Sequence, residues 1–183
     1  MKIVRFLILF FLINIFFFPV QSSQKIILNE LFNQLGKVNN SKTAILLENK
    51  IWSIWNKHPN NDKLTEKLEF GTGLMQEGSY EYALKVFNNV LVSDPNWSEA
   101  WNKRATLFFF MNQYTESLND IEKVLDIESR HFGALSGQAR IFIKLQEYEK
   151  AIISLKKALK FYPSFRSGEL ISEIEKLIKE KSI

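Results

Sequence analysis

The sequence predicts an all-α fold built from antiparallel helix pairs that stack in series. A spacing of 34 residues separates Tyr80, Tyr114 and Tyr148, and Pro95 and Pro163 lie two such steps apart. A fixed period of this length is typical of repeat proteins, which bury a continuous core between neighbouring units. The chain has 183 residues and no cysteine, so we expect its stability to come from the stacked apolar faces rather than from disulfides.

Small residues keep the same period on both sides of each tyrosine. The first set, nine positions before the tyrosines, is Gly71, Ala105 and Ala139, and the second, three positions after, is Ala83, Ser117 and Ala151. A larger side chain at such a place would hold two helices apart. We therefore expect the two helices of each unit to make their closest contact at these positions.

Each period contains two stretches with helical spacing, separated by a short polar turn. In the middle unit, Trp101, Ala105 and Phe108 lie on the first helix. The turns are predicted at Gly78-Ser79, Asn112-Gln113 and Gln146-Glu147. Asp94-Pro95 and Tyr162-Pro163 end their helices, because proline lacks the backbone donor and disfavours helix in the residue before it. The predicted units are residues 64–97, 98–131 and 132–165.

The flanking segments continue the helical pattern. Residues 28–38 and 42–57 are predicted as a helix pair within a degenerate N-terminal unit, residues 25–60, because Pro59 lies 36 residues before Pro95. At the other end, residues 166–181 are predicted as an amphipathic helix that covers the last unit, with Ser164 as its cap.

These residues resemble the tetratricopeptide-repeat (TPR) family, whose 34-residue helix-turn-helix unit has tryptophan, small residues, tyrosine and proline at set places. Residues 98–129 match it best, through Trp101, Ala105, Phe108 and Tyr114. Lys67 and Ser129 depart from the pattern. The resemblance implies a right-handed superhelical stack, a TPR solenoid.

The N-terminus has a different character. Lys2 and Arg5 precede an apolar run that ends at Phe18, followed by Pro19 and small or polar residues. This order is typical of a secretory signal peptide, here residues 1–22, with cleavage between Ser22 and Ser23. An uncleaved anchor is the alternative, although the run is shorter than the about 18 residues that usually span a bilayer. In either case we expect an exported bacterial protein, periplasmic or membrane-tethered through this segment.

Composition and motif searches argue against several function classes. Removing residues 1–22 leaves a net charge of +2, spread along the helices, so we expect no nucleic acid partner. His58 and His131 are expected to be solvated or to pack, because they lack metal-binding spacing. Gly71-Thr72-Gly73 lacks the lysine of a phosphate loop. We expect no enzyme activity, cofactor or metal.

Carboxylates on the second helices also fail to suggest catalysis. Glu116, Asp120 and Glu122 are expected on exposed helix faces, where single charges do little more than interact with solvent. No serine has a plausible base partner nearby in the sequence.

The resemblance implies a binding surface, because the first helices of successive TPR units line a concave groove. The groove positions are Leu68, Thr72 and Met75, then Asn102, Thr106 and Phe109, then Ser136, Arg140 and Ile143. We expect Asn102 to bond a peptide backbone, Phe109 to anchor an apolar side chain and Arg140 to pair with a carboxylate.

One well-known TPR mode is argued against by the sequence. Some TPR co-chaperones clamp a C-terminal carboxylate with basic and amide side chains. The matching places here hold Leu68, Thr72, Lys103, Gly133 and Gly137, so only one basic group remains.

Two functions follow from the sequence. The first is an adaptor in the bacterial envelope that binds a protein or peptide segment in the groove. The second is a structural subunit of an oligomeric or membrane-associated complex, with the groove filled by its own N-terminal helices. Membrane contact is expected only if the N-terminal segment stays uncleaved.

Overall fold

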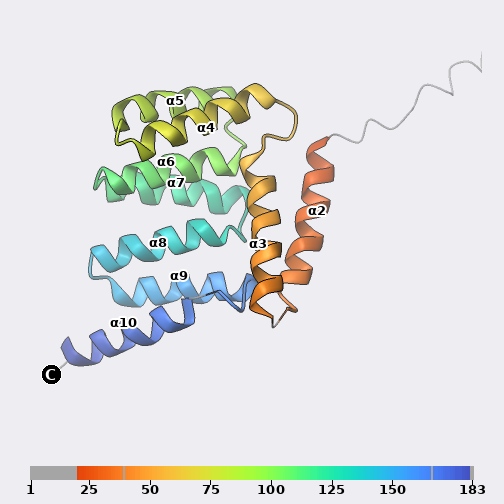
Figure 1. The fold of residues 1–183 in the computed structure, drawn as a ribbon. Helices are drawn as coiled ribbons and strands as arrows, with labels where there is room; N and C mark the ends of the chain where they lie inside the picture. The colour runs from red at the N-terminus through yellow and green to blue at the C-terminus, as the bar shows by residue number, and fades with distance from the viewer. Residues whose placement is uncertain (1–19, 39, 166, 182–183) are drawn as a thin grey trace, which may run out of the picture.

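The structure is a computed structural model that describes residues 20–38, 40–165 and 167–181. In these ranges the chain forms nine α-helices and no strand (Figure 1). The helices are α2 (Val20–Leu35), α3 (Ser41–Asn56), α4 (Asp62–Gln76), α5 (Tyr80–Ser93), α6 (Ser98–Phe110), α7 (Tyr114–Ile127), α8 (Phe132–Lys144), α9 (Tyr148–Phe161) and α10 (Ser167–Lys181). The predicted all-α fold is confirmed. Most of the predicted signal peptide lies outside the described residues.

Three helix pairs, α4–α5, α6–α7 and α8–α9, form the stack (Figure 1). The turn inside each pair contains one residue with positive φ, at Gly78 (80°), Asn112 (58°) and Gln146 (60°). This left-handed conformation ends the first helix sharply, and glycine and asparagine adopt it at least cost. The three predicted turns are therefore confirmed, with one geometry repeated in each unit.

The small residues lie at the helix contacts, as predicted. The Oγ of Ser117 donates a hydrogen bond to the carbonyl oxygen of Ala105 across the α6–α7 contact, at 2.7 Å. A Cβ added at Gly71 would lie 2.7 Å from a ring carbon of Phe87 on α5. Ala83, Ala139 and Ala151 are completely buried. Any of these positions would be overpacked by a larger side chain.

The N-terminal helix pair forms, but it does not stack on α4 as a further unit. Instead, α3 runs across the stack and α2 lies on the outer side of α3 (Figure 1). Phe32 and Trp55 share a buried cluster with Phe132 and Tyr162, which belong to the third unit. The pair therefore shares its apolar core with residues far along the chain rather than with the α4–α5 unit that follows it.

The sequence of α4 gives a physical reason for this arrangement. The positions of Lys63, Glu66 and Lys67 correspond, one period later, to Trp97, Ala100 and Trp101. In the second unit these side chains pack in the cluster shared with α4 and α5. In α4 all three are charged and exposed, so the first unit lacks the apolar side chains with which the second unit packs on its preceding neighbour.

At the other end, α10 covers α9 as predicted. Ile171 and Ile174 are buried against the cluster that contains Ala151 and Leu155. The expected cap is wrong, because α10 begins at Ser167 and Ser164 lies in the preceding turn. Among the described helices, none combines the length and the hydropathy needed to cross a bilayer.

Candidate functional site

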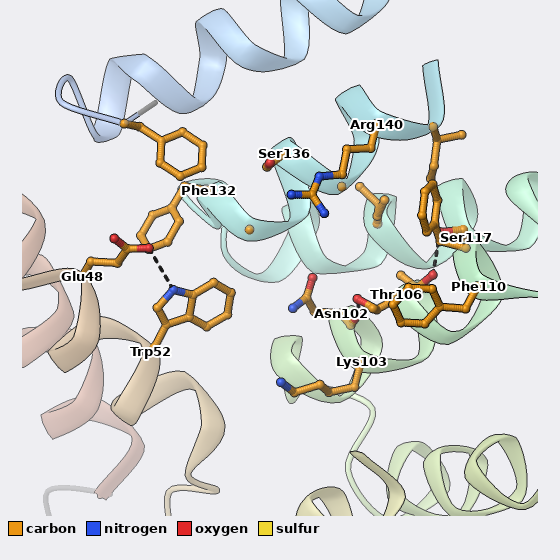
Figure 2. A pocket seen from close by; sticks show the side chains of 17 residues that line it. Glu48, Trp52, Asn102, Lys103, Thr106, Phe110, Ser117, Phe132, Ser136 and Arg140 are labelled. Carbon is orange, nitrogen blue, oxygen red and sulfur yellow. Dashed lines mark hydrogen bonds between the residues drawn. The ribbon is translucent and has the colours of Figure 1, made fainter. Parts of the chain in front are cut away.

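A cavity of about 340 Å³ opens between α3, α6 and α8 (Figure 2). It mixes aromatic rings with amide, hydroxyl and charged groups. Its aromatic and polar lining residues are Glu48, Trp52, Asn102, Lys103, Thr106, Phe109, Phe110, Ser117, Phe132, Ser136, Arg140 and Phe165. Cavities with an apolar wall and a few placed polar groups are typical ligand sites.

The structure brings five of the nine predicted groove residues together in this cavity, namely Asn102, Thr106, Phe109, Ser136 and Arg140. Leu68 and Thr72 border a smaller cavity of about 240 Å³ towards α4, which meets the first at Lys103. That these residues bind a partner remains a prediction.

Three apolar residues at predicted groove positions, Leu68, Met75 and Ile143, pack against the core. Leu68 is only 1% exposed and Met75 is 7% exposed, and both pack in the cluster of the first unit. Ile143 packs beside the cluster that contains Ala139. Since an apolar side chain at the edge of a helix contact gains free energy by turning inwards, Leu68 and Met75 offer little surface to a partner, and Ile143 is partly buried.

The sequence did not indicate the third wall of the cavity, which comes from α3. The indole Nε1 of Trp52 donates to Oε1 of Glu48 at 3.3 Å, and the hydroxyl of Tyr162 donates to Oε2 of Glu48 at 2.9 Å. The bond from Tyr162 connects α3 to the end of α9. Because α3 forms a wall and leaves the cavity open, the N-terminal pair narrows the groove without filling it.

Gly133 makes room for this wall, because a Cβ at that position would overlap the ring of Trp52. We expect Gly133→Ala to displace Trp52 and to lower the free energy of unfolding by about 1–3 kcal/mol, the usual cost of overpacking. The matched control is Gly137→Ala on the same helix. The added Cβ would lie 3.8 Å from its nearest neighbour, the Cδ1 atom of Ile121, which is an ordinary van der Waals distance. Since alanine favours helix over glycine by about 1 kcal/mol, this control should be neutral or stabilising.

Urea denaturation followed by circular dichroism measures both variants. Trp52 fluorescence reports the displacement directly, against the background of the other three tryptophans. Equal stability of the two variants would contradict the close packing of α3 on α8.

A buried ion network lies under the cavity. Glu99 is 0% exposed, and its Oε2 accepts hydrogen bonds from Nε2 of His131 at 3.0 Å and from Nδ2 of Asn102 at 3.1 Å. The Nζ of Lys103 lies 3.1 Å from its Oε1. Burial raises the pKa of Glu99, but the hydrogen bond from His131 and the charge of Lys103 outweigh it, so the pKa falls below 4.5. Glu99 therefore compensates the positive charge of Lys103.

Arg140 differs from Lys103 in having no such compensation. Its side chain is exposed on α8, and within the described part of the chain no hydrogen bond or ion pair reaches its guanidinium group. Figure 2 shows Arg140 on the opposite side of the cavity from Glu48. The amide nitrogen of Asn102 donates a hydrogen bond to Glu99, so its Oδ1 atom is left as an acceptor. Among the described residues, the cavity thus presents one cation without an opposite charge and one amide oxygen without a donor.

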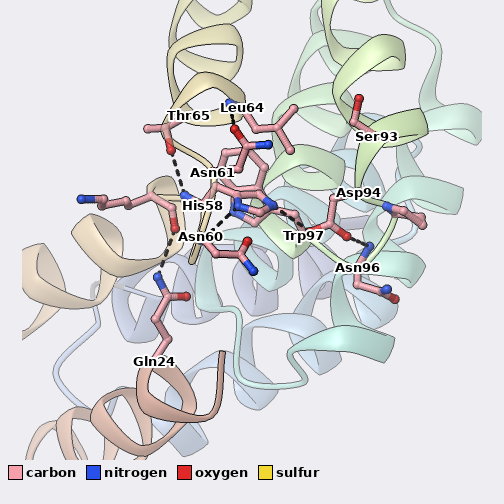
Figure 3. A network of polar contacts seen from close by, with 12 residues as sticks. Gln24, His58, Asn60, Asn61, Leu64, Thr65, Ser93, Asp94, Asn96 and Trp97 are labelled. Carbon is pink, nitrogen blue, oxygen red and sulfur yellow. Dashed lines mark hydrogen bonds and ion pairs between the residues drawn. The ribbon is translucent and has the colours of Figure 1, made fainter. Parts of the chain in front are cut away.

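Both histidines pack rather than face solvent. Nε2 of His58 lies 2.9 Å from Oδ2 of Asp94, and its ring meets Trp97 edge-on (Figure 3). The indole of Trp97 donates to the carbonyl oxygen of Trp55 at 2.9 Å. The ring of His131 stacks on Trp55 at 3.9 Å. These contacts join the N-terminal pair to the stack, and neither histidine has the surroundings of a metal ligand.

Asp120 corrects another expectation, because it is only 4% exposed. Its carboxylate accepts two hydrogen bonds of 2.8 Å from Arg104. Glu116 and Glu122 are exposed as predicted. In the ranges that the structure describes, no three acidic or histidine side chains gather closely enough to hold a metal ion.

Comparisons with known sequences identify the same kind of repeat in this chain. The family model described as tetratricopeptide repeat matches residues 98–131 and 133–165. A TPR repeat-containing protein of Rhizobium etli is 33% identical over 148 residues, which are 81% of this chain and 72% of that protein. Hsp70-Hsp90 organizing protein 3 of Arabidopsis thaliana is 24% identical over 115 residues, 63% of this chain but 20% of its own length.

Solved structures share the fold. The first TPR of Spaghetti, bound to an HSP90 peptide, has a TM-score of 0.61 at 18% identity, covering 66% of this chain and 96% of that chain. The type III secretion chaperone SycD of Yersinia enterocolitica, in complex with a peptide of the translocator YopD, has a TM-score of 0.60 at 19% identity, covering 69% and 100%. Together with the Rhizobium relative and the three stacked helix pairs, these likenesses show that the chain belongs to the tetratricopeptide-repeat family.

Proposed function

We propose that this protein is a non-enzymatic interaction adaptor that binds a segment of another protein in the cavity between α3, α6 and α8. The observation that carries the proposal is the open cavity itself, in which aromatic rings surround the free cation of Arg140 and the free oxygen of Asn102. Such a surface suits a peptide, which needs both apolar anchoring and polar pairing.

The peptide complexes of Spaghetti and SycD support the proposal, because chains of the same fold hold a peptide in each. Two of the five positions that match the carboxylate clamp are glycines on α8, Gly133 and Gly137. We therefore infer that a partner makes its ionic contact with Arg140 instead, a position one turn further along α8.

We place this activity in the bacterial envelope. The N-terminal sequence supports the location, because the positive region, apolar run and small-residue end have the order of an export signal. In this proposal a cleaved protein acts in the periplasm, and an uncleaved protein acts at the membrane that holds its N-terminal segment.

Site-specific photo-crosslinking in cells tests the function with the full chain. A photoreactive residue at Ser136, which lines the cavity, is expected to capture a small set of proteins. The matched control carries the same residue at Val92, which is 85% exposed on α5 and does not line the cavity. We expect Phe110→Ala combined with Arg140→Gln to abolish the Ser136 adducts.

The double variant should fold normally, because Phe110 is 49% exposed and Arg140 is exposed, and surface changes usually alter stability by about 0.5 kcal/mol or less. The same adducts from Ser136 and Val92 would refute a groove-directed function. Adducts between copies of this chain only would favour the alternative, a structural subunit of an oligomer.

A further inference from the structure

We infer that the cavity is a socket for one bulky apolar side chain that stands next to a carboxylate on the partner segment. This inference rests on the proposed function and names the chemistry of the partner. It follows from the depth of the cavity, the position of its uncompensated charge and the arrangement of its acceptors.

The depth of the socket comes from α8. Ser136 and Gly137 carry little or no side chain and line the cavity on α8, and Gly133 lets the ring of Trp52 pack directly against the same helix. The volume of about 340 Å³ lies near the lower end of the range of about 300–1,000 Å³ for ligand pockets. A cavity of this volume suits a single large side chain.

The sign of the recognised charge follows from the ion pairs. Glu99 compensates Lys103 at 3.1 Å, whereas Arg140 has no such partner among the described residues. A planar guanidinium group binds a carboxylate through two parallel hydrogen bonds. The free positive charge therefore selects a carboxylate.

The opposite wall fixes the direction of the segment. Both oxygens of Glu48 already accept hydrogen bonds, from Trp52 and Tyr162, so this end of the cavity is unfavourable for a second carboxylate. A partner carboxylate is therefore expected at the Arg140 end, with the apolar side chain lying between Arg140 and Trp52 (Figure 2). The Oδ1 atom of Asn102 can accept a backbone N–H of the same segment.

The N-terminal segment of this chain does not have this chemistry. Residues 1–19 contain many apolar side chains, but their charged residues are Lys2 and Arg5 and they contain no carboxylate. A segment of this composition would leave Arg140 without an opposite charge. A segment of another protein with an acid beside a bulky apolar residue fits better.

Small probes of matched shape test the chemistry without knowledge of the partner. Indole-3-acetate joins an indole ring to a carboxylate, and tryptamine joins the same ring to a cation. We expect indole-3-acetate to shift the backbone amide signals of Gly133, Ser136 and Gly137 of the full chain, in a titration followed by nuclear magnetic resonance. Tryptamine and acetate should bind at least fivefold more weakly.

Arg140→Gln should weaken indole-3-acetate at least fivefold and should not weaken tryptamine, because the substitution removes a like charge. Lys144→Gln, one turn further on α8, is the matched charge control. Equal binding of the two indoles, or no effect of Arg140→Gln, would overturn the carboxylate preference. Equal binding of acetate would overturn the apolar socket, and so would amide shifts confined to other parts of the chain or no shifts at all. None of these outcomes would contradict the adaptor function, which the crosslinks from Ser136 test separately.

Discussion

Glu99→Ala is expected to lower the free energy of unfolding by about 3–5 kcal/mol, the usual cost of removing one partner of a buried ion pair. The carboxylate of Glu99 is the acceptor for both His131 and Asn102, and it pairs with Lys103. Without it, the ring N–H of His131 is buried with no acceptor in contact. Urea denaturation of the variant and the wild type measures the difference, and a loss below about 1 kcal/mol would contradict the role of the network.

The matched control is Glu99→Gln, which keeps the shape and an oxygen acceptor but removes the charge. Its expected loss is smaller, about 1–3 kcal/mol. The two proteins should also respond differently to acid. Because the pKa of Glu99 in the folded state lies below 4.5, its ionised form stabilises the protein above that pH. This contribution disappears as the pH falls through the folded pKa, so acid should narrow the gap between the wild type and Glu99→Gln.

Arg104→Ala is expected to have an effect of similar size, about 3–5 kcal/mol, because it leaves the carboxylate of Asp120 buried without its partner. Arg104 donates two hydrogen bonds to Asp120 and a third, of 2.7 Å, to Oδ1 of Asn88 on α5. Its guanidinium carbon lies 4.8 Å from the ring centre of Trp101. One side chain therefore joins the first two units, and thermal unfolding should show both of them destabilised.

Acid should reduce this effect. Burial raises the pKa of Asp120 above 3.8, although Arg104 partly opposes the shift. Removing Arg104 raises the pKa further, so the ionised carboxylate of the variant destabilises the fold above that pKa and less as the pH falls towards 3.8. The control is Arg104→Met with Asp120→Leu, which replaces the pair by apolar side chains and should recover most of the loss. A double variant as unstable as Arg104→Ala would show that the pair itself is not the cause.

The repeat units could be predicted because their signals are local and recur. A period of 34 residues places Ala83, Ser117 and Ala151 at equivalent contacts, and the structure puts all three there. The same register contained a signal for the buried acid that we expected to be exposed. Asp120 lies one period after Val86 and one period before Ser154, and neither of these residues is exposed. The repeat register therefore favours burial at this position, although an aspartate is usually exposed.

The third wall of the cavity could not be predicted in this way. The contact between Trp52 and Gly133 joins segments that belong to different repeat units. No sequence pattern around either residue predicts that the two are in contact. The period also left the rotation of each helix undetermined by a few tens of degrees. This is why Leu68 and Met75, at groove positions of the register, pack in the core, while Arg140 is exposed and Asn102, although only 9% exposed, lines the cavity.

The path of α3 across the stack has a consequence for how the chain folds. In a plain repeat array each unit contacts only its neighbours, so an end can open without disturbing the middle. Here Tyr162 bonds Glu48 over a separation of 114 residues, and Arg130 bonds Asn29 over 101. Both ends of the stack are thus linked into one cooperative unit. Contacts of this range also form late, because loop closure precedes them and slows folding. We therefore expect α2 and α3 to pack onto the stack late in folding.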